Sequence, residues 1–401
     1  MNRNCFYILL IFILISGCNK IKRSEQTLLT MDYDQLLEAE KAISKNSPLY
    51  VSAFRRLTKE ADYALNLPLY SVTQKNVLPP SGDKNDYMSL APYWWPDTSK
   101  PDGMPYIRRD GIRNPESEEG RFDRHRLGLM TDDVITLTLA WFFTGEEKYA
   151  EKASILLENW FTDPATRVNP NLTYAQSIPG ILDGRGIGII DTRRYIEIID
   201  AITILERSHS WNSRKSKRLQ EWFSEYLYWL VNSDHGKDER AKKNNHGTWY
   251  DLQIVCYANF TGNHELARKI IRQSGPERID IQIDSLGRQE FELVRTRSFS
   301  YSVFNLEALI NLGRMGEMIG EENWGDASHA SKVKSACDFL FSYTEKMEDW
   351  PYEQITPVEW SRLLPLIKEA GRLFKTNEYN IFVEYLEEKL KPNDRLIITK
   401  I

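Results

Sequence analysis

Apolar residues recur every three to four positions through most of the chain beyond residue 130, which is the spacing of an amphipathic helix. Residues 132–145 show this first: the segment begins with two aspartates and ends at Gly145, which are start and stop signals for a helix. The same spacing predicts helices over 146–161, 193–205, 214–231, 247–262, 264–273, 301–320, 328–347 and 360–374. Many of these segments end in glycine and restart within a few residues, so we expect neighbouring helices to be antiparallel.

Strand signals are scarce. Residues 278–284 alternate between polar and apolar side chains, but they lie between helical segments, so we predict a helix there as well. The chain lacks the fixed short repeat of a tetratricopeptide array. Paired helices along 401 residues predict an all-α fold, either an α/α toroid or an irregular α-solenoid.

Two long segments, residues 77–124 and 161–189, depart from the helical pattern. Both are rich in proline, glycine, asparagine and aromatic residues. Loops of this length inside a compact domain are usually functional. Because these two carry aromatic and charged side chains rather than the serine and glycine of a linker, we predict that they form the walls of a groove.

The N-terminus has the layout of a secretory signal. Arg3 precedes an unbroken apolar run over residues 5–15, and a small-residue sequence that ends at Cys18 follows. The run is too short to span a bilayer comfortably as a permanent helix. The sequence "LISGC" resembles the bacterial lipobox, in which the cysteine becomes the lipidated first residue of the mature protein.

This layout predicts the domain organisation. We expect residues 1–17 to be a lipoprotein signal peptide, residues 18–30 to be a tether and residues 31–401 to form one domain. The protein would then be exported and anchored to a bacterial membrane through a lipid on Cys18. The alternative is a plain signal peptide that happens to contain a cysteine.

Composition narrows the function classes. With 41% apolar and 12% aromatic residues the chain can bury a full core, and a net charge of −5 argues against nucleic acid as a partner. The two cysteines of the expected domain, Cys256 and Cys337, suit buried apolar positions. No pair among the six histidines has metal-ligand spacing on a helix, and no phosphate-binding loop or nucleophile elbow is present. We therefore predict no metal and no cofactor.

Four polar clusters remain, each embedded in aromatic residues. They are Asn245, His246 and Trp249; Arg295, Arg297 and Tyr301; Asn171, Tyr174 and Gln176; and Tyr93, Trp94, Trp95, Arg108 and Arg109. Each has an ordinary structural explanation: Asn245 as a helix cap, His246 as a core histidine, the arginines as surface ion pairs and Tyr301 as a core residue with its hydroxyl at the rim.

Taken together, the clusters indicate a groove for an acidic sugar polymer, with rings on aromatic faces and carboxylates on arginine. In a uronic acid, the C5 hydrogen is α to the carboxylate and β to the O4 glycosidic bond, so elimination across C5 and C4 breaks the chain. The charge that builds on the carboxylate must be spread over donors such as asparagine, protonated histidine and arginine. A tyrosine whose pKa is lowered by a neighbouring cation can serve as the base.

Four segments resemble the alginate lyase-like domain of bacterial polysaccharide lyases: "LAPYWWPDTSKPDGMPYIRRDGIRNPE", "NPNLTYAQ", "NNHGTWYDLQ" and "RTRSFSYS". The resemblance covers about residues 50–370. It implies an α/α toroid, an incomplete barrel of antiparallel helix pairs with long groove-forming loops. It also implies β-elimination by a tyrosine and a histidine, with an asparagine and an arginine neutralising the carboxylate.

Carried over to this chain, the resemblance makes Asn245 and His246 the Asn-His pair and Tyr301 the catalytic tyrosine. Arg295 is the expected carboxylate partner, with Arg297 as the other candidate. Some relatives have a second aromatic residue near the tyrosine, but the neighbouring positions here are Phe299 and Val303, which cannot transfer a proton. This difference puts a two-tyrosine mechanism in doubt.

Stereochemistry bears on the substrate. In mannuronate and glucuronate H5 and O4 lie on the same side, so a single tyrosine can remove one proton and deliver another, whereas guluronate needs two groups. With one clear tyrosine we expect mannuronate-rich alginate or a glucuronate polymer.

Two other function classes stay open. A glycoside hydrolase would need two carboxylates, for which Asp183, Asp191, Glu292 and Glu307 are candidates. A non-catalytic glycan-binding surface lipoprotein would need the tryptophans and tyrosines, but neither the Asn-His pair nor Tyr301.

Overall fold

The structure is a computed structural model that describes the chain except for residues 1–27, 390, 392–393 and 400–401. The expected signal peptide and Cys18 therefore lie outside the described residues. The principal helices are α1 Tyr33–Ser44, α2 Pro48–Leu65, α3 Asp123–Thr144, α4 Glu147–Phe161, α5 Tyr195–Leu205, α6 Ser213–Asn232, α7 Asp234–Arg240, α8 Asn245–Phe260, α9 His264–Ser274, α12 Ser298–Ile319, α13 Ala327–Phe341, α14 Trp360–Leu373 and α15 Asn380–Glu387. Three short helices are α10 Asp280–Gln282, α11 Glu290–Leu293 and α16 Leu396–Thr399.

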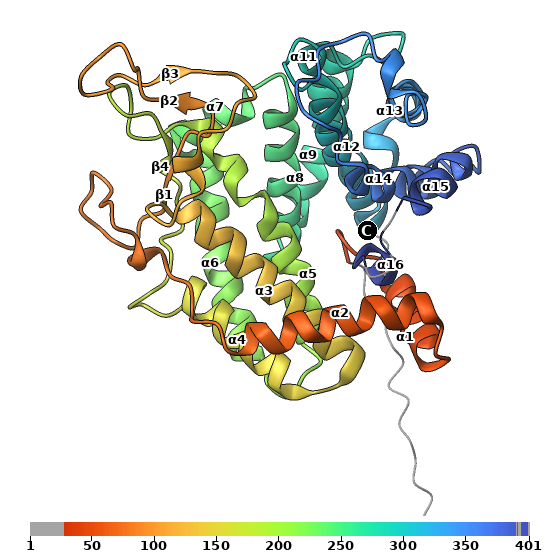
Figure 1. Ribbon diagram of the computed structural model, residues 1–401, viewed down its shortest axis with the longest axis horizontal. Coiled ribbons are helices and arrows are strands. Elements are labelled where there is room, and N and C mark those ends of the chain that lie inside the picture. Colours follow the sequence, from red (N-terminus) through yellow and green to blue (C-terminus); the bar gives the residue numbers. More distant parts are fainter. Residues whose placement is uncertain (1–27, 390, 392–393, 400–401) are drawn as a thin grey trace, which may run out of the picture.

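The helices form two layers, as the α/α toroid requires (Figure 1). An inner row runs through α3, α5, α8, α12 and α14, each packed on the next. The outer helices α2 and α4 cover α3, while α6 and α9 cover α8, α13 covers α12 and α15 covers α14. The inner helices are buried nearly all round because they are enclosed: α8 has thirteen buried residues, including Leu252, Val255 and Tyr257. The predicted all-α fold is confirmed.

One inner helix starts earlier than its sequence pattern indicates. The helix expected over 132–145 begins at Asp123, within a polar stretch. The carboxylate of Asp123 is buried, lies 3.1 Å from the Lys75 ammonium and accepts a hydrogen bond from the Met88 backbone. Tertiary partners therefore extend α3 where its own sequence is a weak helix former. This helix is also long and apolar enough to cross a membrane, and here it packs against α2, α4 and α5.

The segment 278–284 is helical through Gln282, as predicted. A π-helical turn over Gly275–Ile279 leads directly into α10, and Ile283 then pairs with Gln289 as an isolated bridge.

The two long loop segments carry the only strands among the described residues. β1 (Met88–Leu90) pairs in parallel with β4 (Tyr174–Ser177), which joins the two segments. β2 (Trp94–Trp95) pairs antiparallel with β3 (Ile107–Arg108) and forms a hairpin. Both pairs lie at one end of the helical array, close to α7 in the view of Figure 1.

The folded domain begins before residue 31, which corrects the expected tether. Leu28 and Leu29 are buried, and the Leu29 backbone and the Thr30 hydroxyl donate hydrogen bonds to Asp200. Arg314 donates to the Leu28 carbonyl, and the side chain of Leu28 packs in a core cluster with residues of α1, α2 and α16. Residues 28–30 therefore belong to the domain, because apolar burial and buried hydrogen bonds hold them there.

Candidate active site

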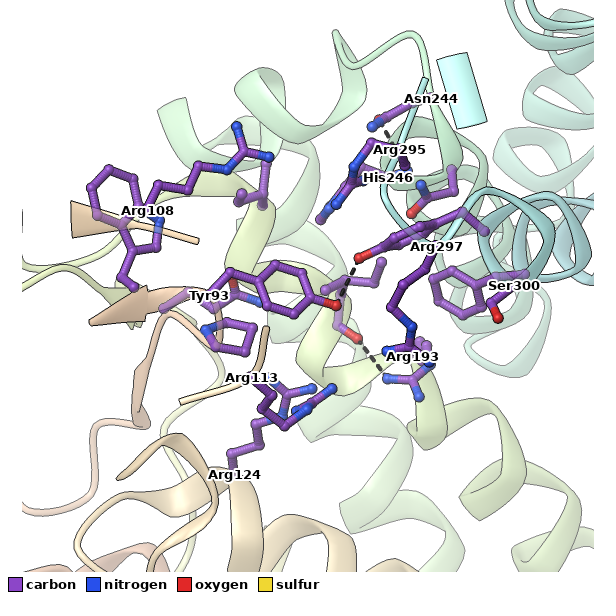
Figure 2. A pocket seen from close by; sticks show the side chains of 18 of the residues that line it. Tyr93, Arg108, Arg113, Arg124, Arg193, Asn244, His246, Arg295, Arg297 and Ser300 are labelled. Atoms are coloured by element: carbon purple, nitrogen blue, oxygen red, sulfur yellow. Dashed lines mark hydrogen bonds between the residues drawn. The ribbon is translucent and has the colours of Figure 1, made fainter. Parts of the chain in front are cut away.

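A cavity of about 550 Å³ lies between the β2–β3 hairpin, the 3₁₀ helix Gly186–Arg194 and the first turns of α8 and α12. Figure 2 shows its side chains pointing inward from these elements. Both long loop segments contribute to its lining, through Tyr93 and Trp94 from the first and Gln176 and Arg185 from the second. They form walls of this cavity, as predicted.

The start of α8 explains the unusual sequence "NNHG". Asn244, not Asn245, is the helix cap, and its side chain accepts a hydrogen bond from the His246 backbone. Asn245 is fully buried and donates from its backbone and its Nδ2 to the two oxygens of Glu292, at 2.7 and 2.8 Å. The second amide N–H of Asn245 remains for a ligand, and its buried Oδ1 has no partner among the described residues.

Glu292 holds Asn245 in place. Its carboxylate is buried on α11, and burial raises its pKa, although the two hydrogen bonds from Asn245 and the positive charge of Arg295 act in the opposite direction. A buried carboxylate with these bonds fixes the orientation of the asparagine amide.

His246 is oriented in the same way by a second buried glutamate. Its Nδ1 lies 2.8 Å from Oε1 of Glu239 on α7, whose side chain is only 1% exposed. Because a carboxylate accepts, we assign the proton to Nδ1, which leaves Nε2 for a ligand. His246 lines the cavity, so this second nitrogen is positioned for proton transfer or for donation to a carboxylate.

Gly247 is required by packing. A methyl group there would fall within contact distance of the Lys242 carbonyl oxygen and the Arg278 guanidinium. We expect Gly247→Ala to lower the free energy of unfolding by about 1–3 kcal/mol, measured by urea denaturation. Gly128 of α3 has open space around it, so Gly128→Ala is the matched control and should stabilise by up to about 1 kcal/mol. Equal stability of the two variants would contradict the packing argument.

Tyr301 lies on the first turn of α12, between a cation and a second tyrosine. The Arg295 guanidinium carbon is 3.9 Å from the centre of its ring. Its hydroxyl is 2.7 Å from the hydroxyl of Tyr93, which comes from the loop before β2 (Figure 2). Phe299 and Val303, the sequence neighbours of Tyr301, are buried and carry no hydroxyl. Tyr93, which is distant in sequence, supplies a second hydroxyl instead. The structure therefore removes the reason for doubting a two-tyrosine mechanism, the lack of a second hydroxyl near Tyr301, while the mechanism itself stays untested.

The expected lowering of the Tyr301 pKa was wrong for the unliganded protein. Burial, followed by the neighbouring Tyr93, raises the pKa of Tyr301 well above its ordinary value, and the opposing effect of Arg295 is smaller. Tyr301 is therefore a neutral proton donor in the free protein at neutral pH.

Arg295 joins the hairpin to α12. Its Nε and Nη2 lie 3.1 and 2.9 Å from the two oxygens of Asp110, a bidentate pair, and Arg108 donates to the same carboxylate. Burial opposes ionisation of Asp110, but hydrogen bonds and charge from Arg295 and Arg108 outweigh it and lower the pKa to about 2. Ionised Asp110 therefore stabilises the folded protein at pH values above the carboxyl pKa of the unfolded chain, which is about 3.9. This stabilisation is lost as the pH falls through about 2, the pKa of Asp110 in the folded protein.

The cavity is strongly cationic. Eight arginines line it against one carboxylate, Glu359, and three of the eight, Arg108, Arg295 and Arg297, are predicted from the sequence. The five that were not predicted are Arg113, Arg124, Arg185, Arg193 and Arg362. For four of them the only sequence signal is the unusual number of arginines within and beside the two long loop segments, whereas Arg362 comes from α14 and had no such signal.

Gln176 supports the wall from behind. Its amide donates to Asp191 and accepts from Arg185, at 3.1 and 2.9 Å, and its side chain is almost fully buried. Its φ of 51° places a residue with a Cβ in the left-handed region, a strained conformation that its hydrogen bonds maintain.

Five predicted binding residues do not line this cavity. Trp249 is buried, stacks on Phe304 and donates its indole N–H to the Phe304 carbonyl, so its assignment to the binding surface was wrong. The indole of Trp95 donates to the Ile112 carbonyl, and Arg109 lies over its ring at 5.2 Å. The remaining two are Tyr174, which is half-buried on β4, and Asn171, whose amide donates to Asp86 in the loop.

The carboxylates proposed for a hydrolase are engaged elsewhere. Asp191 accepts hydrogen bonds from Tyr87, Ser89 and Gln176, Glu292 binds Asn245, and Glu307 pairs with Arg362. Asp183 is exposed and does not line the cavity. A single lining carboxylate does not meet the requirement of two that flank the scissile bond.

Within the part of the chain that the structure describes, no three His, Cys, Asp or Glu side chains converge in a way that could hold a metal ion. Cys256 and Cys337 are buried free thiols, as the sequence indicates.

Comparison with known proteins shows to which protein family the chain belongs. The family model for alginate lyase matches residues 71–350. The crystal structure of an alginate lyase from Bacteroides ovatus is 37% identical, with a TM-score of 0.87 over 94% of this chain and 99% of that one. No curated protein sequence matches the chain. The chain therefore belongs to the alginate lyase family and is a polysaccharide lyase.

More distant structures share the fold alone. Alginate lyase A1-III from Sphingomonas species A1 is 13% identical, with a TM-score of 0.50 over 92% of this chain and 95% of that one. A variant of alginate lyase A1-III complexed with a tetrasaccharide has the same identity and a TM-score of 0.55, over 93% of this chain and 96% of that one.

Proposed function

We propose that the protein cleaves uronic-acid polymers by metal-independent β-elimination, with mannuronate-rich alginate or a glucuronate polymer as substrate. The observation that carries the proposal is the placement of Tyr301, the Asn245–His246 pair and Arg295 around one cationic cavity. A tyrosine hydroxyl for proton transfer thus lies beside several donors for a carboxylate, which is what this elimination requires.

The reaction proceeds by proton transfers alone. A base removes H5 as a proton, and the electron pair of the C5–H bond forms the C4=C5 double bond. The C4–O4 bond breaks, and the leaving O4 takes a proton from Tyr301. Asn245 and Arg295, joined by His246 when both of its ring nitrogens carry a proton, stabilise the charge that develops on the C6 carboxylate, because these side chains are held in place before substrate binds.

Two groups can act as the base. The free protein holds Tyr301 protonated, so Tyr301 must release its proton to solvent before it can remove H5, and the Tyr93 hydroxyl can then donate a hydrogen bond to the resulting phenolate. His246, with Nδ1 bound to Glu239, presents Nε2 without such a step. If Tyr301 acts as both base and acid, the mechanism suits mannuronate and glucuronate, in which H5 and O4 lie on the same side. If His246 is the base and Tyr301 the acid, the mechanism suits guluronate, in which they lie on opposite sides.

Product absorbance tests the proposal. We expect the ultraviolet signature of an unsaturated uronate with polymannuronate or glucuronan, with chelator present, and less with polyguluronate or hyaluronan. New reducing ends without this absorbance would indicate hydrolysis. Binding without new ends, by protein of verified fold, would indicate a glycan-binding protein.

We also propose export and lipid anchoring through Cys18, on the support of the N-terminal sequence. Expressed in a bacterium, the full chain should partition with membranes and incorporate labelled fatty acid, and Cys18→Ala should abolish the labelling. Labelling that persists in Cys18→Ala would contradict this proposal.

A further inference from the structure

The cationic charge of the catalytic cavity exceeds what one carboxylate needs. Asn245, His246 and Arg295 already surround Tyr301 for the reacting uronate. Most other lining arginines are matched by carboxylates: Arg113 pairs with Glu118, Arg108 with Asp110, and Arg362 with Glu307 at 2.6 Å. Arg124 lies 3.7 Å from carboxylate oxygens of both Asp191 and Glu118.

Three lining arginines have no such partner within the described chain: Arg185, which donates to Gln176, Arg297, and Arg193. Of the three, Arg193 is the one whose guanidinium lies over the ring of Phe304. Among the described residues no carboxylate oxygen lies within ion-pair distance of Arg193, and its one hydrogen bond, to the Ile190 carbonyl, is long at 3.4 Å. Burial, together with the positive charges of Arg362 and Arg124, lowers its pKa to about 10. A half-buried cation beside two other cations destabilises the folded protein unless an anion binds there.

The position of Arg193 places this unmatched charge beside the reacting group. Its guanidinium lies over the ring of Phe304 at 5.4 Å, and that of Arg362 lies over the same ring at 4.8 Å. Phe304 is one helical turn beyond Tyr301 on α12, so both residues face the cavity. A chain that placed one sugar at Tyr301 would bring its next sugar towards Phe304 and Arg193.

We infer that Arg193, flanked by Arg124 and Arg362 over the face of Phe304, binds the carboxylate of a second uronate next to the one that undergoes elimination. The inference rests on the proposed function for the identity of the ligand. It makes Arg193 a specificity-determining residue, because a polymer with a neutral sugar at this position leaves the cation unmatched. The enzyme then prefers runs of consecutive uronates to polymers in which uronates alternate with neutral sugars.

The inference is tested by measuring binding separately from turnover. In a Tyr301→Phe background, calorimetry with tetramannuronate and tetraglucuronate should show affinity at least about tenfold weaker after Arg193→Gln. The neutral oligomer mannotetraose should bind both proteins equally. Arg194→Gln is the matched control: Arg194 is the next residue, pairs with Asp132 and Glu197 and does not line the cavity. It should change these affinities less than about twofold.

Two further readouts separate binding from a structural role. In the otherwise unaltered protein, Arg193→Gln should raise KM on the polymer with kcat nearly unchanged. Its Tm should stay the same or rise, because an unmatched, half-buried cation is removed, and Arg193→Lys should give an intermediate KM.

The inference is overturned if Arg193→Gln weakens mannotetraose binding as much as oligouronate binding, lowers kcat alone or leaves oligouronate affinity unchanged. A wild-type protein that produces no unsaturated product from any uronate polymer would overturn the proposed function instead, while the calorimetric comparison would still report on Arg193.

Discussion

Tyr301→Phe is expected to reduce kcat on uronate polymers by a factor of about 100 to 10,000 while substrate affinity changes little. The substitution removes only the hydroxyl that donates the proton to O4. It keeps the aromatic ring under Arg295, so the cation–ring contact and the start of α12 should be preserved. Initial rates of unsaturated-product formation measure the loss, and calorimetry measures the affinity.

The pH profile of the wild-type protein tells which group removes H5. The pKa of Tyr301 is raised, so its ionised fraction grows about tenfold per pH unit through neutral and moderately alkaline pH. If Tyr301 is the base, kcat/KM should rise with pH over that range. If His246 is the base, kcat/KM should not follow this tenfold rise per pH unit.

Tyr93→Phe is the control for the Tyr301 prediction. It removes the hydrogen bond between the two hydroxyls and leaves the Tyr301 hydroxyl in place. A smaller loss than in Tyr301→Phe is expected. A Tyr301→Phe protein with nearly wild-type kcat would exclude Tyr301 as the proton donor.

His246→Ala is expected to abolish measurable turnover and to leave the fold intact. The imidazole lines the cavity and is 18% exposed, so its removal enlarges the cavity and leaves no large hole in the core. Turnover is lost because Nε2 acts either as donor to the C6 carboxylate or as base, and each role is worth a factor of about 100 or more. Circular dichroism and Tm verify folding, and product absorbance measures the rate.

Glu239→Gln tests the orientation of His246 separately. Glutamine keeps the size of the side chain, but its amide lets either imidazole tautomer form, whereas the carboxylate favours the proton on Nδ1. A loss of about tenfold to a hundredfold in kcat is expected. Full activity in both variants would show that His246 takes no part in the reaction.

The sequence alone determined the features that depend on local pattern. Apolar spacing along α4, α5, α6, α8, α9, α12, α13 and α14 sets each helix and its buried face, because helical periodicity is a property of neighbouring residues. The segments "NNHG" and "RTRSFSY" carry Asn245, His246 and Tyr301 on the first turns of α8 and α12, so their placement on adjacent helices follows from the helix pattern once the fold class is known.

Only the tertiary structure decided the rest, because those features depend on which distant segments meet when the toroid forms. Tyr93 reaches Tyr301 across 208 residues, and Glu239 and Glu292 reach the Asn-His pair from separate helices. The burial of Trp249 depends on the packing of Phe304 against α8, and the early start of α3 depends on Lys75. The burial of Tyr301 and Arg193 and the charges beside them also arise where distant segments meet. Their pKa shifts and their proposed roles are therefore properties of the folded cavity rather than of any sequence motif.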